Sequence, residues 1–139
     1  MSENLDLVKG YLLDIDLKIV SEDEAEELIV VEDEENGIHN LIIDCEPPIV
    51  ILEQLIMDVP EDAGDFFKRL LQMNRTMVHG AFVLDDEEGN RVLFRDTLQL
   101  ESRDCNELEG SIRSLELALA ENGPELLEFS HRQTGGADK

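Results

Sequence analysis

The fold is decided by residues 61–100, which read EDAGDFFKRLLQMNRTMVHGAFVLDDEEGNRVLFRDTLQL. In Glu61–Val78 the apolar residues recur mostly at steps of three and four, a spacing that predicts an amphipathic helix. From Val78 to Leu84, and again from Val92 to Leu100, the period becomes two, which predicts two strands. A polar turn containing Gly89 separates them and indicates a hairpin. We therefore expect a helix that leads directly into a hairpin.

The residues before this stretch predict one helix and three strands. Apolar residues at three- and four-residue steps predict a helix over Ser2–Ile19. Short β-branched runs predict strands at 28–31, 38–45 and 49–59, with turns at Asn36-Gly37 and Pro47-Pro48. The acidic run 21–27 favours a solvated connector or the start of a strand.

The residues after the hairpin predict a third helix. Asp104 and Glu107 have the spacing of a capping box, and apolar residues then repeat at three- and four-residue steps. Gly123-Pro124 predicts the end of this helix, with one further turn over residues 125–129. We expect residues 1–130 to form a single α+β domain and residues 131–139 a flexible tail.

The predicted element order is α-β-β-β-α-β-β-α. Short turns between consecutive strands make those pairs antiparallel, so we expect a five-stranded antiparallel sheet. The helices should pack mainly on one face of that sheet, which is an α+β fold.

The composition combines an ordinary hydrophobic content with an extreme charge. The hydrophobic fraction is 42%, typical of globular proteins, while 34 acidic and 11 basic residues give a net charge of −23. Such a field repels nucleic acid and anionic lipid and favours basic partners. There is no apolar run of about 20 residues that could insert into a membrane. The acidic N-terminus is not a signal peptide, so we expect a cytoplasmic protein with Cys45 and Cys105 reduced.

Recurring catalytic and metal-binding motifs are absent from the sequence. The three histidines and two cysteines lack the spacing of a zinc site, and no nucleophile or phosphate-loop motif is present. The acidic loop Asp85–Asn90 has Asn90 where an EF-hand requires glycine. Among 34 carboxylates, neighbouring pairs are expected by chance. We therefore predict no enzyme, no metal site and no cofactor.

Two polar residues interrupt apolar patterns. Asn74 falls on the apolar face of the central helix, and we expect it to bond backbone near the helix end. Asp96 falls in phase with Phe94 and Leu98. An isolated buried carboxylate is costly, so Asp96 should pair with Arg91 or Arg95, or sit at a bulge.

Two predicted strands are apolar on both of their faces, at Leu41–Ile43 and Ile49–Leu52. An antiparallel sheet with one wet face normally alternates, and three helices can cover only one face of five strands. The second face should therefore meet a twin subunit or a bound segment. A first helix that wraps around the sheet, or a bulge, is the alternative. We predict a homodimer.

Three segments carry a resemblance to a known family. Residues 66–74, FFKRLLQMN, are followed by GAFVLD at 80–85 and VLFRDTLQLE at 92–101, and then by a helix with Leu108, Ile112 and Leu115. This arrangement resembles the YbjN family and, more distantly, the class I type III secretion chaperones of the Tir-chaperone type. The likeness covers residues 62–119. The acidic turns and the segment 124–129 depart from a dedicated secretion chaperone.

The resemblance implies an α+β homodimer that binds other proteins. In the secretion chaperones the dimer forms largely through the helix before the hairpin, and an effector segment wraps the sheet surfaces in extended form. The YbjN relatives are described as sensory-transduction or stress regulators. No cofactor is implied.

These observations predict a non-enzymatic homodimeric protein-binding module with chaperone-like or regulatory action. We expect a client segment, held by strand addition or side-chain pockets, on the strand 49–56, with Val50, Leu52 and Ile56 forming the surface. Phe67 and Leu71 should lie in the dimer helix. The alternative is an acidic electrostatic decoy or a divalent-cation (calcium) buffering protein.

Overall fold

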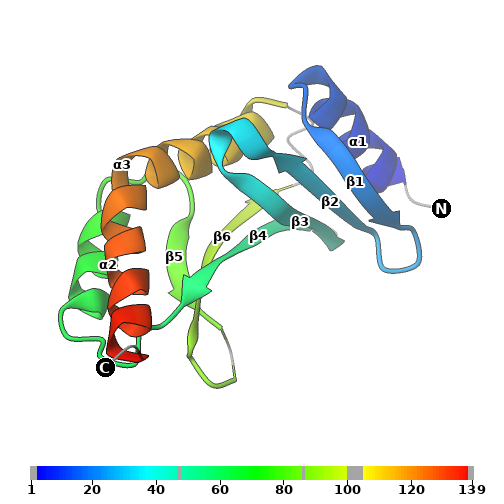
Figure 1. Ribbon diagram of the computed structural model, residues 1–139. Helices are drawn as coiled ribbons and strands as arrows, with labels where there is room; N and C mark the ends of the chain where they lie inside the picture. The colour runs from blue at the N-terminus through cyan, green and yellow to red at the C-terminus, as the bar shows by residue number, and fades with distance from the viewer. Residues whose placement is uncertain (1–2, 47, 86, 100–104, 138–139) are drawn as a thin grey trace.

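A six-stranded antiparallel sheet with strand order β1-β2-β3-β4-β6-β5 is the frame of the molecule. The computed structural model describes residues 3–46, 48–85, 87–99 and 105–137. Figure 1 shows the elements, which are α1 (Glu3–Asp14), β1 (Lys18–Asp23), β2 (Leu28–Asp33), the 3-10 helix η1 (Glu34–Asn36), β3 (Ile38–Glu46), β4 (Ile49–Asp58), α2 (Phe66–Asn74), β5 (Ala81–Leu84), β6 (Arg91–Gln99) and α3 (Cys105–Ala137). The predicted α+β class, element types and antiparallel pairing are confirmed.

The sheet has one strand more than the five predicted, because α1 ends earlier than its apolar spacing indicates. Asp16 takes a left-handed conformation with φ +64°. Its N–H donates to the Leu13 carbonyl, and the Leu17 N–H donates to the Leu12 carbonyl, each over 3.1 Å. This pair of bonds is a Schellman ending, which glycine usually supplies. The chain is thereby turned into β1, which pairs with β2.

The predicted helix and hairpin are confirmed, with shorter bounds for α2 and β5. Between them, Gly80 has φ +74°, and a Cβ at this position would overlap the ring of Phe94. Glycine is required there both by the backbone angle and by the close approach of that ring.

The helix α3 does not stop at Gly123-Pro124 as predicted but continues to Ala137. Figure 1 shows it changing direction near its middle, so that its second half runs beside α2. Pro124 lies inside the helix, where its ring crowds the carbonyl of Ala120 and removes one hydrogen bond. The proline thus bends the helix instead of ending it. Whether the last nine residues are flexible stays a prediction.

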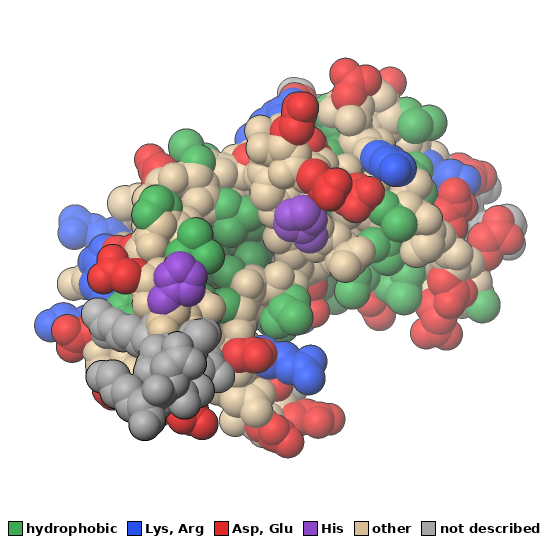
Figure 2. All heavy atoms as spheres, in the orientation of Figure 1, with side chains coloured by type: hydrophobic (Ala, Val, Ile, Leu, Met, Phe, Trp, Pro, Cys, Tyr) green, Lys and Arg blue, Asp and Glu red, His purple; other side chains and the backbone are tan. Residues whose placement is uncertain are grey.

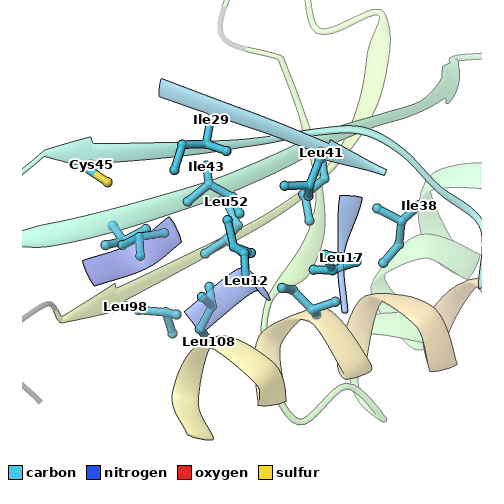
Figure 3. Packing of buried hydrophobic residues seen from close by; sticks show 14 of the residues in the cluster. Leu12, Leu17, Ile29, Ile38, Leu41, Ile43, Cys45, Leu52, Leu98 and Leu108 are labelled. Atoms are coloured by element: carbon cyan, nitrogen blue, oxygen red, sulfur yellow. The ribbon is translucent and has the colours of Figure 1, made fainter. Parts of the chain in front are cut away.

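The bend lets one helix serve two hydrophobic clusters. The first half of α3 packs with α1 and the sheet through Leu108, Ile112 and Leu115, and the second half packs with α2. Figure 3 shows side chains of the sheet and of α1 and α3 meeting in the first cluster. The second cluster consists of Phe66, Leu70, Met73, Phe82, Val92, Ala118, Leu126 and Phe129.

Candidate functional site

The helices that the structure describes lie on one face of the sheet. On β3, Leu41, Ile43 and Cys45 are buried in the first cluster, so Ile42 and Asp44 between them point to the opposite face. The same alternation holds on the neighbouring strands. We call the uncovered side the open face. Its apolar side chains are Leu28, Val30, Ile42, Ile49, Ile51, Leu55, Val83 and Leu93.

The open face agrees with the expectation that apolar side chains project from both sides of the sheet. Ile42 is 40% exposed and Leu55 is 53% exposed. However, two of the three residues predicted to form the client-binding surface lie on the covered face, so the prediction is wrong for these two. Val50 and Leu52 are 3% and 0% exposed inside the first cluster, and Ile56 is partly buried against both clusters. The uncovered side of β4 is formed instead by the alternate residues Ile49, Ile51, Glu53 and Leu55.

The phase of β4 could not be read from its residues because Ile49–Leu52 is apolar on both sides. The polar Gln54 also lies on the covered side, only 4% exposed. It accepts from the His39 N–H and donates to the Gly37 carbonyl, both over 3.1 Å. The buried amide of Gln54 bonds two backbone groups. In the sequence alone, a glutamine at this position is indistinguishable from a surface residue.

Acidic and apolar side chains alternate across the centre of the open face. Asp44 on β3 lies opposite Ile51 on β4, and Glu46 lies opposite Ile49. Ile42 lies opposite Glu53, whose carboxylate pairs with Arg95 on β6. Each acid therefore has an apolar neighbour across the strand pair.

Asp44 is the most perturbed carboxyl group of this face. Burial, the hydrogen bond and charge of Glu46, and the charges of Glu26 and Glu53 together raise the pKa of Asp44 to about 6. Its Oδ1 is buried and has no hydrogen-bond partner among the described residues. A cation placed beside this carboxylate would offset the negative charges of Glu46, Glu26 and Glu53 that raise its pKa.

Both outer edges of the sheet resist the addition of another strand. At β5, Asn74 of α2 donates to the Phe82 carbonyl over 3.1 Å and accepts from the Phe82 N–H over 2.8 Å. The predicted backbone bonding of Asn74 is confirmed, although its partner is the strand edge. At the other edge, β1 has a bulge between Ile19 and Ser21 and ends in exposed acids. Bulges and charges of this kind block edge pairing.

The surface of α2 differs from the rest of the molecule in charge. Residues 66–84 contain three bases and no acid, in a chain with 34 acidic residues. Phe67 is 42% exposed and Leu71, one turn later, is 71% exposed. We call these two side chains the α2 surface. Both residues predicted for the dimer helix thus lie at the surface, and their role in a dimer stays a prediction.

Two groups considered in the sequence, the thiol of Cys45 and the carboxylate of Asp96, lie on β3 and β6. Cys45 carries a free thiol, and burial raises its pKa to about 11, so it is poorly nucleophilic at neutral pH. Asp96 does not pair with Arg91 or Arg95 as predicted. One of its oxygens accepts from the Thr97 N–H over 2.9 Å, and the other is buried without a described partner.

The described residues do not group three His, Cys, Asp or Glu side chains closely enough to hold a metal ion. Within the same residues, no helix is long and apolar enough to cross a membrane. A shallow groove does lie in the angle of the bent α3, lined by Ile56, Met57, Leu119, Leu126 and Leu127 among others. Figure 2 shows hydrophobic side chains gathered in this hollow, with acidic side chains spread over the surface around it.

An α+β fold with three described helices on one side of an antiparallel sheet is that of the secretion-chaperone class. The family model CesT_Tir_1 matches residues 1–132. The chain therefore belongs to the CesT/Tir chaperone family.

Two solved structures show the same fold at low sequence identity. YbjN, a proposed transcription regulator from E. coli, is 14% identical with a TM-score of 0.65, over 88% of this chain and 93% of that chain. The type III secretion chaperone SycH of Yersinia pestis, solved in complex with a fragment of YscM2, is 12% identical with a TM-score of 0.61. That match covers 84% of this chain and 98% of SycH. No curated protein sequence matches the chain.

Proposed function

We propose that the protein is a non-enzymatic, cytoplasmic homodimer that holds a segment of another protein, with chaperone-like or regulatory action. The open face carries this proposal, because a sheet face with eight apolar side chains that none of the described elements covers is unusual for a monomer. Membership of the CesT/Tir family and the protein fragment bound to SycH support the same class of function.

The α2 surface is the proposed dimer interface. Two chains of charge −23 repel each other, and the repulsion is smallest where acids are absent. Phe67 and Leu71 lie within residues 66–84, the longest stretch of the sequence without an acidic residue. A second copy of the chain would remove the exposed apolar area of these two side chains from water. Arg69 is anchored by two hydrogen bonds to Glu125, of 2.6 and 2.8 Å, which fixes α2 against α3.

Light scattering after size exclusion tests the dimer. Wild-type protein at micromolar concentration should have about twice the chain mass of 15.7 kDa, whereas Leu71→Asp should have the mass of one chain. Leu13→Asp is the matched control, because Leu13 is 64% exposed on α1, and it should remain dimeric. A wild-type chain of single mass, or a dimeric Leu71→Asp, would overturn this interface.

Holding of client segments is tested separately, by diluting a chemically denatured model protein into buffer with and without this protein. Suppressed aggregation at stoichiometric amounts is the expected result. Unchanged aggregation across several denatured proteins would contradict the proposed function.

The second candidate, an acidic decoy or calcium buffer, is favoured by the charge of −23. Calorimetry with calcium distinguishes it. Stoichiometric binding at micromolar affinity would support an ion buffer, and the absence of such binding would leave the protein-binding function.

A further inference from the structure

We infer that the open face binds an amphipathic helix whose apolar stripe is bordered by lysine or arginine side chains. This inference rests on the proposed protein-binding function and specifies the chemistry of the partner. Three features of the described residues lead to it: the closed sheet edges, the distribution of acids, and the width of the apolar surface.

The closed edges of the sheet favour a helix over an extended strand as the bound partner. A strand gains its affinity by main-chain hydrogen bonds to a sheet edge, and Asn74 already occupies those of Phe82 on β5. On β1, the bulge at Ile19 and the exposed acids oppose the same pairing. An extended segment lying on the face would have no partners for its own backbone. A helix satisfies its backbone internally and is a usual cover for a sheet.

The acidic residues of the open face favour a basic partner over a second copy of this chain. Two open faces packed together would bring Asp44 and Glu46 of one copy toward those of the other, whereas Glu53 is already paired with Arg95 of its own chain. Like charges forced together in this way oppose association. Among the residues that the structure describes, Asp44 Oδ1 has no hydrogen-bond partner. A lysine or arginine beside the apolar stripe of a helix would meet these carboxylates with the complementary charge.

Across β2, β3 and β4 the open face has the width of one helix. Val30 on β2 pairs with Ile42 on β3, and Ile51 lies on the next strand, β4. Adjacent strands are about 4.8 Å apart, so three strands span roughly 10 Å. That distance matches the diameter of an α-helix with side chains, about 10–12 Å. Asp44 lies between Leu28 and Ile51 across these strands, and Glu46 lies opposite Ile49.

Fluorescence anisotropy with a labelled peptide tests the inference. The probe is an amphipathic peptide of about 18 residues built from leucine and lysine, and the comparison peptide has glutamate in place of every lysine. At physiological salt the leucine–lysine peptide should bind the wild-type protein, and the leucine–glutamate peptide should not. Equal binding of the two peptides, or no binding of the first, would overturn the inference.

Variants locate the binding on the open face. Ile42→Ser with Ile51→Ser should weaken binding at least about tenfold, and so should Asp44→Asn with Glu46→Gln. The charge-matched control is Glu87→Gln with Glu88→Gln in the exposed hairpin turn, which should change the affinity less than about twofold. Circular dichroism confirms folding, and the second pair replaces only polar groups by polar groups. An equal loss in the control would reduce the binding to net charge alone and overturn the inference.

Failure of the inference can be told apart from failure of the proposed function. If the peptide binds and is released by Leu127→Ser in the α3 groove instead of by the open-face variants, the protein still holds peptides but at another surface. If aggregation of denatured proteins is also unaffected, the protein-binding function itself is wrong.

Discussion

Asp44 occupies the centre of the open face at an energetic cost to the free protein. Its pKa of about 6 in the folded state lies above its ordinary value of 3.8, so the folded state binds more protons than the unfolded state between these two pH values. The folded state is therefore penalised above pH 6, and the penalty is relieved as the pH falls through 6 toward 4. A charge that destabilises the free molecule is consistent with a carboxylate that serves a bound cation.

The substitution Asp44→Asn should consequently stabilise the protein at neutral pH. We expect the free energy of unfolding to rise by on the order of 1 kcal/mol at pH 7.5, with partial exposure reducing the full effect of the shift. At pH 4 the gain should be close to zero. Urea unfolding at both pH values measures it, with Glu87→Gln as the control for loss of one charge. A pH-independent change in stability would contradict this account.

Asn74 joins the end of α2 to the edge of β5. Replacing it by alanine leaves the Phe82 N–H and carbonyl without their described partners, so Asn74→Ala should cost about 1–3 kcal/mol of unfolding free energy. The freed edge should also promote association at high protein concentration. Chemical denaturation and light scattering measure the two effects. Asn90→Ala in the exposed turn is the comparison, and equal effects of the two substitutions would show that the edge contact is unimportant.

At the scale of elements, periodicity predicted most helices and strands but not where they end. The end of α1 depends on Asp16 in a left-handed conformation, which the sequence does not signal as glycine would. The continuation of α3 past Pro124 depends on Leu126 and Phe129, which pack against α2 from far along the chain. Both boundaries are set by conformational or tertiary energies larger than the local preference.

Because the two halves of α3 pack in different hydrophobic clusters, we predict that each half stabilises a different part of the molecule. Phe129 lies 4.9 Å from Phe66 between ring centroids, in an edge-to-face arrangement. Phe129→Ala should therefore cost about 3–5 kcal/mol, and amide exchange should accelerate in α2 more than in β2 and β3. Leu127→Ala, at a position 59% exposed on the same helix, should cost less than about 0.5 kcal/mol. Uniform acceleration through the whole chain would indicate one cooperative core instead.

At the scale of the whole molecule, the sequence predicted that one sheet face would be uncovered but not which residues form it. The apolar content of Leu41–Ile43 and Ile49–Leu52 established that three helices would be insufficient. The side on which each residue lies depends on register, and a shift of one residue exchanges the faces. For this reason Val50 and Leu52 lie on the covered side, contrary to the prediction from the sequence. The division of charge between the open face and α2 becomes visible only when the strands are placed side by side.

This division predicts opposite salt dependence for the two proposed interactions. Chains of charge −23 repel each other as they dimerise through α2, and salt screens that repulsion, so the dimer should tighten between about 50 and 500 mM salt. The leucine–lysine peptide is attracted to the acids beside Ile42 and Ile51, and the same change should weaken its binding several-fold. Sedimentation equilibrium and fluorescence anisotropy measure the two constants on the same protein. If both moved in one direction, the acid-free helix and the acidic sheet face would not be separate binding surfaces.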